Sequence, residues 1–259
     1  MPVIGSFYRQ LVLRLHHALC RRFCHSSLAA EQLANDVMSS VAHELSTPLT
    51  SIRAMAEMML DEADMASAQR QQFLQIIVAE SGRLTRLVNQ VLDIAKIESG
   101  QAEWHKADID MVALLQQCVL SMQASYHDAK VHLSLQSDAE VVPLRADADR
   151  LTQVVLNLLA NALKFAPRET GVVEVYLRDV SNGVQVEVSD NGSGLAVEDQ
   201  EKIFAKFQQV GGEQHPQGTG LGLPISLSII EHFGGRMWVK SVPGEGACFG
   251  FYLPRKTTI

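Results

Sequence analysis

The sequence predicts an α-helical hairpin that dimerises into a four-helix bundle, followed by an α+β two-layer sandwich. Before residue 99, apolar residues step by three and four along two long runs, which is the spacing of one helix face. After about residue 110, stretches with period-two alternation are mixed with helical stretches, which is typical of an α+β fold. Residues 100–109 follow neither period and are predicted to be a linker.

The composition limits the classes of function. The chain has 259 residues, 47% of them hydrophobic, which is enough material for two packed domains. The formal net charge of −7 argues against direct binding of nucleic acid, which requires a basic surface. Four cysteines do not form a disulfide framework in a chain of this length, so a reducing compartment such as the cytoplasm is expected.

Residues 1–26 are predicted to form a basic amphipathic helix. The segment is too interrupted for a signal peptide or a membrane span, because arginines break its apolar stretch at Arg9, Arg14, Arg21 and Arg22. Such a helix either leads into the next domain as a linker or lies on an anionic membrane surface. His16, Cys20 and Cys24 are one helical turn apart, so they are either incidental or the ligands of a metal or redox site.

The helical hairpin is predicted over residues 27–99. Its first helix has apolar residues at Val37, Val41, Leu45, Leu49, Ile52, Met55 and Met59, and its second has them at Phe73, Ile76, Ile77, Leu84, Leu87, Val88, Val91, Leu92 and Ala95. A polar turn over residues 61–66 makes the two helices antiparallel. Each apolar stripe is wider than one partner helix can cover, so we expect a homodimer.

His43 lies in the middle of the first helix and is predicted to face solvent. At 100° per residue it is about 200° from Val41 and Leu45, which face the core. Glu44 adjoins it, and Thr47 is one turn further on the same face. Pro48 removes a backbone hydrogen bond, so we expect a bend there. An isolated exposed histidine is usually an ordinary surface residue, and these four positions alone do not define a chemistry.

The second domain is predicted over residues 110–259. Helical spacing occurs at residues 110–126, 147–165 and 221–233, and strand-like alternation at residues 130–136, 172–180, 183–190, 236–242 and 247–254. The glycine-rich stretch of residues 197–219 is too long for an ordinary connection, so it is predicted to be a functional loop.

One helix of the second domain carries polar residues on a shared face. Asn157 and Asn161 are one turn apart, and Lys164 is two turns from Asn157. Carboxamide oxygens suit Mg²⁺, and a lysine supplies point charge for phosphate. The alternative is that the asparagines satisfy backbone groups where the helix meets the sheet.

Two glycine motifs follow. Asp190 ends a strand and precedes Gly192 and Gly194, so its carboxylate could accept a hydrogen bond from an exocyclic amine while the backbone approaches a ring. Further on, the motif GTGLGL opens a helix, and a glycine-rich helix N-terminus can hold anions. Either motif alone also occurs in plain turns.

The order and spacing of these motifs resemble the transmitter region of a two-component sensor histidine kinase with a GHKL-type ATP-binding domain, over roughly residues 27–256. HELSTPLTSI resembles the phosphoacceptor box of that family and NLLANALKF its asparagine box. SDNGSG and GTGLGLPI resemble its two glycine boxes, and KIFAKF its phenylalanine box.

The resemblance implies a Mg²⁺- and ATP-dependent protein-histidine kinase. It makes His43 the phosphorylated residue, Glu44 the acid that orients or deprotonates it, and Thr47 a residue that places water for dephosphorylation of the partner. Asn161 matches the Mg²⁺ ligand. The other positions matching the ATP site are Asn157, Lys164, Phe165, Asp190, Gly192, Gly194, Gly218, Thr219, Gly220, Leu221 and Gly222. The implied partners are a second copy of the chain and the receiver domain of a response regulator.

The sequence also departs from the family. Ser46 stands where many relatives have arginine or lysine, and Gln208 and Gln209 stand where many have an arginine that reaches the γ-phosphate. An ATP-binding signalling scaffold with weak or no autokinase activity is therefore the alternative function. A third is a GHKL ATPase or serine kinase, against which the histidine-bearing hairpin argues. No sensory domain precedes the hairpin, so we expect either a separate sensor subunit or a longer, membrane-associated protein of which this is the cytoplasmic part.

Overall fold

The computed structural model describes residues 28–62, 64–206 and 220–255. The predicted basic helix of residues 1–26, with His16, Cys20 and Cys24, lies outside them. The chain divides into two compact units, Met1–Asn89 and Gln90–Ile259, which are considered separately below. In the part of the chain that is described, no helix is both long and apolar enough to cross a membrane.

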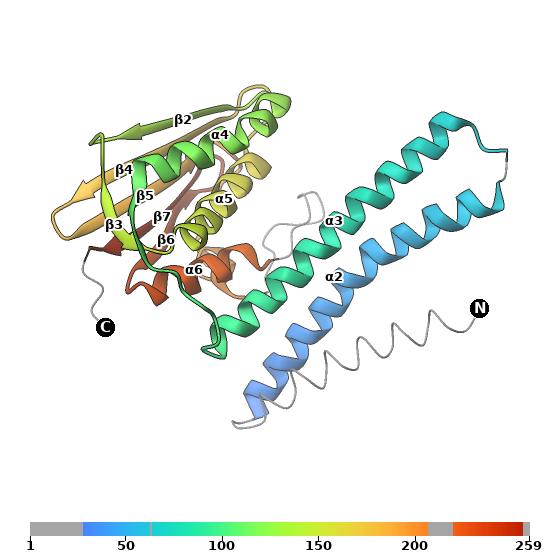
Figure 1. Cartoon of the computed structure of the whole chain (residues 1–259), viewed down its shortest axis with the longest axis horizontal. Coiled ribbons are helices and arrows are strands. Elements are labelled where there is room, and N and C mark those ends of the chain that lie inside the picture. The colour runs from blue at the N-terminus through green and yellow to red at the C-terminus, as the bar shows by residue number, and fades with distance from the viewer. Residues whose placement is uncertain (1–27, 63, 207–219, 256–259) are drawn as a thin grey trace. The chain divides into compact units, whose positions relative to one another are not determined.

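The first unit is the predicted helical hairpin (Figure 1). Helix α2 spans Leu28–Asp61 and helix α3 spans Ser67–Glu98, of which the residues up to Asn89 belong to this unit. The turn between the helices coincides with the predicted one. Pro48 is buried inside α2, which continues through it as one helix. The hairpin is therefore built as its apolar spacing predicts.

The hairpin leaves much of its apolar surface in solvent. Over residues 39–62 and 64–89, the buried hydrophobic side chains are Val41, Met65 and Leu87. Large hydrophobic side chains of the same helices are exposed, namely Leu49, Met58, Leu60, Leu74, Val78 and Val88. Two helices can cover only one side of each other, so a wide stripe remains uncovered.

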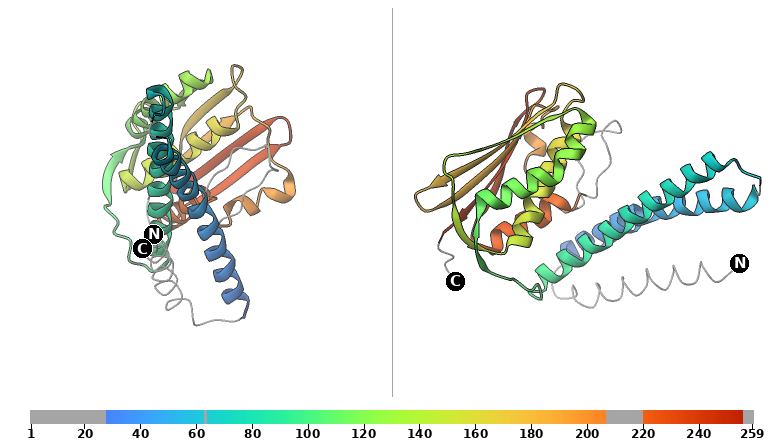
Figure 2. Two further views of the ribbon diagram at one scale, coloured as in Figure 1. Left: turned by 90° about the vertical axis from the view of Figure 1, so that its right-hand side faces the viewer. Right: turned by 45° about the horizontal axis from the view of Figure 1, so that its top comes forward.

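The second unit is a two-layer α+β sandwich, as predicted (Figure 1). Its mixed sheet has the order β2-β4-β5-β7-β6, with bounds His132–Ser137, Val172–Val180, Gly183–Asp190, Gly246–Pro254 and Arg236–Val242 in that order. Strands β2 and β4 pair in parallel, and the other neighbours pair antiparallel. Three helices cover one face of this sheet, α4 (Met111–Ala129), α5 (Ala148–Phe165) and α6 (Gly222–His232) (Figure 2).

Local chemistry fixes where the helices of this layer begin. The Asp110 carboxylate accepts a hydrogen bond from the Val112 N–H at the start of α4, and Asp147 accepts one from the Arg150 N–H at the start of α5. Such caps satisfy N–H groups that have no partner inside a helix. The apolar stripe of α5 then packs on the alternate buried residues of β5, Val184, Val186 and Val188.

A two-stranded antiparallel ribbon of β1 (Ala107–Asp110) and β3 (Pro143–Ala146) was not among the predicted elements. Part of it occupies the predicted linker. Four residues are too few to show a periodicity in sequence, and the pairing joins segments far apart in the chain. The Asp110 carboxylate also accepts from the Val142 N–H, which holds the ribbon to the start of α4. The predicted functional loop contains two short 3₁₀ turns, η1 (Val197–Asp199) and η2 (Lys202–Phe204), within its described part.

Candidate functional site

The first group of predicted site residues lies on α2. His43 is exposed, as the helical rotation predicted. Glu44 beside it is mostly buried, with 16% of its side chain exposed, and its carboxylate lies 3.6 Å from the guanidinium of Arg83 on α3. This ion pair joins the two helices of the hairpin. Sequence reasoning missed Arg83, because only the packing of the hairpin brings it to Glu44.

The hydroxyls that follow His43 bond back to their own helix. Thr47 is exposed, and its Oγ1 donates to the carbonyl of His43 over 3.3 Å. Ser46 Oγ donates to the carbonyl of Ala42 over 2.7 Å. Such bonds are the usual arrangement for hydroxyls inside helices. Thr47 therefore presents its hydroxyl on the turn that carries His43.

The second group lies at the end of β5. Asp190 is 7% exposed, and its Oδ1 accepts a hydrogen bond from the Gly192 N–H over 2.8 Å. Burial raises the pKa of this carboxyl above its ordinary value, while the N–H groups of Gly192 and Ala247 oppose the rise. Tyr126 lies within the electrostatic reach of Asp190, and burial together with that charge raises the pKa of the phenol. A carboxylate held in place in this way can accept a hydrogen bond from an N–H group of a ligand.

The glycines around Asp190 leave no room for side chains. A Cβ at Gly192 would lie 2.6 Å from the carbonyl oxygen of Phe165. At Gly194, whose φ is +67°, it would lie 2.1 Å from the carbonyl oxygen of Val242. Sequence reasoning missed Gly246, where a Cβ would lie 2.0 Å from the carbonyl oxygen of Asp190. Its signal was present in the motif PGEG before the last strand.

The third group lies on α5. The Nδ2 of Asn157 donates to the carbonyl of Gly222 and to Ser226 Oγ, both over 3.2 Å. The ammonium of Lys164 lies 4.9 Å from the centre of the Phe165 ring, and burial lowers the pKa of that ammonium. Asn161 lies one turn from both Asn157 and Lys164 and is partly exposed. Sequence reasoning missed Ser226, whose contact with Asn157 depends on how α5 and α6 pack.

The second glycine box is described only in part. Gly220 has φ +62°, Leu221 is fully buried, and Gly222 is the first residue of α6. Gly218 and Thr219 lie outside the described residues, as do Gln208 and Gln209. The described portion places a glycine-bearing helix start beside Asn157 on α5.

The polar side chains of the second unit are of the kinds that suit a nucleotide bound together with magnesium. Over residues 28–62, 64–206 and 220–255, no three His, Cys, Asp or Glu side chains come together to bind a metal. The polar face of α5 instead offers carboxamide oxygens and one ammonium, which suit a hard cation shared with phosphates. The Asp190 carboxylate, held by tightly packed backbone at Gly192 and Gly246, suits a ligand that carries an amine.

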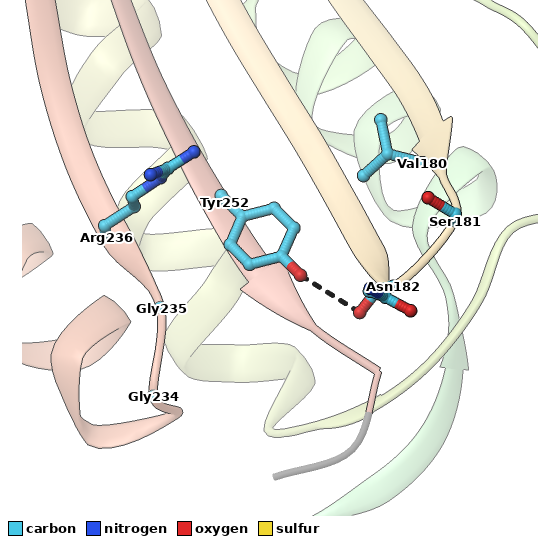
Figure 3. A pocket seen from close by; sticks show the side chains of 7 residues that line it. All are labelled: Val180, Ser181, Asn182, Gly234, Gly235, Arg236 and Tyr252. Atoms are coloured by element: carbon cyan, nitrogen blue, oxygen red, sulfur yellow. Dashed lines mark hydrogen bonds between the residues drawn. The ribbon is translucent and has the colours of Figure 1, made fainter.

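A separate hollow of about 430 Å³ lies at the opposite end of β5 from Asp190 (Figure 3). It is lined by Val180, Ser181, Asn182, Gly234, Gly235, Arg236 and Tyr252. The Tyr252 hydroxyl points across it and donates to the Asn182 carbonyl over 3.0 Å. None of the predicted site residues lines this hollow, so it is distinct from the site that the sequence predicts.

Two protein families match the sequence of this chain. The family described as "His Kinase A (phospho-acceptor) domain" matches residues 33–100. The family described as "Histidine kinase-, DNA gyrase B-, and HSP90-like ATPase" matches residues 146–257. An uncharacterized sensor-like histidine kinase of Porphyra purpurea is 34% identical over 236 residues, which are 86% of this chain and 36% of that protein. The chain spans well under half of the length of this relative, and between 12% and 46% of the length of other curated relatives.

Solved structures show the same arrangement of elements. Full-length ShkA in complex with AMPPNP is 29% identical, with a TM-score of 0.65 over 88% of this chain and 46% of that one. The histidine kinase ThkA in complex with the response regulator protein TrrA is 24% identical, with a TM-score of 0.69 over 88% of this chain and 64% of that one. At this identity, the likeness to ThkA shows a shared fold.

Proposed function

The chain belongs to the histidine kinase family, and we propose that it uses Mg²⁺ and ATP to phosphorylate its own His43. It then passes the phosphoryl group to an aspartate on the receiver domain of a response regulator. The observation that carries this proposal is the exposed His43 next to a carboxylate that Arg83 restrains.

His43 supplies the nucleophile. One imidazole nitrogen attacks the γ-phosphorus, an N–P bond forms, and the bond from that phosphorus to the β–γ bridging oxygen breaks with ADP as the leaving group. Glu44 accepts the proton of the other ring nitrogen, or a hydrogen bond from it, as positive charge develops on the ring. Arg83 keeps that carboxylate in place.

The second unit supplies the nucleotide site. Asp190 accepts a hydrogen bond from the adenine amine, and the glycines beside it allow the close backbone packing that holds this carboxylate in place. Lys164 and the N–H groups at the start of α6 offset the charge of the phosphates. When bound, Mg²⁺ supplies further positive charge on those phosphates, and Asn161 is the residue that would hold it. The complex of the related ShkA with AMPPNP supports an adenine nucleotide here.

The phosphohistidine is a reactive donor, which suits transfer to an aspartate. The complex of ThkA with a response regulator supports a partner of that kind for this fold. Thr47, exposed one turn from His43, is suited to orienting the water that hydrolyses the partner's phosphoaspartate. We include this phosphatase activity in the proposal. The exposed apolar side chains of α2 and α3 support a homodimer that completes a four-helix bundle.

The proposal is tested by incubating the purified chain with γ-labelled ATP and Mg²⁺. We expect label that is alkali-stable and acid-labile, as phosphohistidine is, and that is lost in His43→Ala. The matched control is His127→Ala, because His127 is also a helical histidine and is exposed in the second unit. It should leave labelling unchanged.

Two outcomes would contradict the proposal. Nucleotide binding without any label in the wild type would favour the ATP-binding scaffold. Label that persists in His43→Ala, or that resists acid, would place the phosphoryl group on another residue.

A further inference from the structure

The carboxamide of Asn157 is held by two groups at the start of α6. Its Nδ2 lies 3.2 Å from the Gly222 carbonyl oxygen and 3.2 Å from Ser226 Oγ. Ser226 is 0% exposed, and its hydroxyl donates to the same Gly222 carbonyl over 3.0 Å. Three polar groups from α5 and α6 therefore meet in one place. The two helices pack against each other (Figure 1).

The chemistry of these partners decides which way the carboxamide faces. A backbone carbonyl oxygen can only accept hydrogen bonds, and the Ser226 hydroxyl has given its one proton to that same carbonyl. The Asn157 atom that contacts both must therefore be the NH₂ group. With the carboxamide reversed, its oxygen would face two acceptors and no donor. The side-chain oxygen of Asn157 is thus the atom that Gly222 and Ser226 leave without a bond from either of them.

This orientation limits what Asn157 can offer a ligand. Its NH₂ group is used by α6, and what remains is an oxygen that can accept hydrogen bonds or bind a cation. Phosphate oxygens are themselves acceptors, so that oxygen cannot bond to them directly. It can bind Mg²⁺ or the water shell of the ion, which prefer oxygen ligands. Asn161 is the next residue on this face of α5.

We propose that Ser226 is a positioning residue that fixes the Asn157 carboxamide so that its oxygen serves the magnesium ion, not the phosphates. This inference rests on the proposed function, since it takes Mg²⁺ with an adenine nucleotide as the ligand. Ser226 contacts neither the nucleotide nor the metal. It acts only through Asn157, and its effect is confined to the magnesium-dependent part of nucleotide affinity.

The chain contains a matched control for this residue. Ser228 lies two residues further along α6, and its Oγ donates to the carbonyl of Pro224 over 3.0 Å, the same back-bond that Ser226 makes to Gly222. The described contacts of Ser228 do not include Asn157. Ser226→Ala and Ser228→Ala therefore remove the same hydroxyl from the same helix, and only the first removes a partner of Asn157.

The experiment measures the Kd of ADP by calorimetry, once with Mg²⁺ and once with EDTA. The quantity compared between variants is the ratio of the Kd in EDTA to the Kd in Mg²⁺, which is large when magnesium strengthens binding. In Ser226→Ala we expect this ratio to fall by about three- to tenfold, the effect of one hydrogen bond, with the Kd in EDTA unchanged. Ser228→Ala should change neither value. Asn157→Ala should lower the ratio at least as much as Ser226→Ala, again without changing the Kd in EDTA. Adding Ser226→Ala to Asn157→Ala should have no further effect.

Three results would overturn the inference. Ser226→Ala could weaken ADP binding equally with and without Mg²⁺, which would indicate a structural role in α6. Asn157→Ala could weaken binding in EDTA, which would indicate a donor to the phosphates. Ser226→Ala could also leave the ratio unchanged. If Ser226→Ala does not fold, Ser226→Cys keeps the volume with a weaker hydrogen-bonding group, and the same criteria apply.

The wild type separates this inference from the proposed function. A wild type that binds no ADP in either condition would overturn both. A wild type whose affinity depends on Mg²⁺, with variants that leave that dependence unchanged, would overturn the inference alone and leave the kinase proposal standing.

Discussion

The hairpin and the sandwich differ in how they bury apolar side chains. In the hairpin, the buried hydrophobic residues over positions 39–62 and 64–89 are Val41, Met65 and Leu87. In the sandwich, three helices close over one face of the sheet, and residues such as Leu115 and Phe251 are fully buried. The sandwich is therefore stabilised by its own core, whereas the hairpin needs a further surface to cover its apolar stripe. We expect the hairpin to gain rigidity when such a surface covers it.

The largest expected effect compares one leucine from each region. Leu115→Ala in α4 removes a side chain that is 0% exposed, so we expect it to lower the free energy of unfolding by about 2–5 kcal/mol. Leu60→Ala in α2 truncates a side chain that is 78% exposed, and should cost less than about 0.5 kcal/mol. Urea unfolding followed by circular dichroism measures both. Equal losses would mean that another surface, such as a second copy of the hairpin, buries Leu60.

The next prediction concerns the uncovered stripe. Leu74 and Val78 are exposed and one turn apart on α3. If they meet a second copy, the double change Leu74→Glu and Val78→Glu should weaken the dimer by at least about 100-fold, because two apolar side chains would be replaced by charges. Light scattering over a dilution series measures the dissociation constant. Leu120→Glu, at an exposed leucine of α4, is the control and should leave it unchanged.

Two glycines should respond in opposite directions. Gly194→Ala in the sandwich adds a Cβ at positive φ and 2.1 Å from a carbonyl oxygen. We therefore expect it to lower the free energy of unfolding by about 2–3 kcal/mol. Gly82 is inside helix α3, where an added Cβ would meet only the Arg86 side chain, at 3.6 Å. Gly82→Ala should therefore raise the free energy of unfolding by up to about 1 kcal/mol.

Gly100→Ala separates the two contributions to the loss at Gly194, which are the positive φ and the close carbonyl oxygen. Gly100 has φ +66° and nothing within 4 Å of an added Cβ, so its substitution should cost about 1–2 kcal/mol, from the backbone alone. Thermal unfolding of the three variants ranks them. A loss at Gly194 no larger than that at Gly100 would mean that the neighbouring carbonyl moves aside at little cost.

The smallest expected effect is on the ion pair beside His43. Arg83→Gln should lower the free energy of unfolding by less than about 1 kcal/mol, since the pair is still partly in solvent. It should nevertheless slow autophosphorylation severalfold, because Glu44 loses its restraint. Arg86→Gln is the control, an exposed arginine one turn further along α3. Initial rates at saturating ATP measure the effect, and equal rates for both variants would remove Arg83 from the mechanism.

Much of the secondary structure could be predicted because its signals are local. The alternation in GVQVEVSD predicted residues 183–190, and β5 spans those residues. The helical spacing after Asp147 predicted α5 to within one residue. The β1–β3 ribbon and the parallel pairing of β2 with β4 could not be predicted, because strand partners far apart in the chain leave no period in either segment.

The sequence by itself determined the order of the elements, the exposure of His43 and the shared face of Asn157, Asn161 and Lys164. These follow from a rotation of 100° per residue within one helix. Tertiary structure alone decided that Arg83 meets Glu44 and that Ser226 turns the Asn157 carboxamide. Those contacts join different helices, and whether two distant side chains meet depends on how the helices pack, which no single segment specifies.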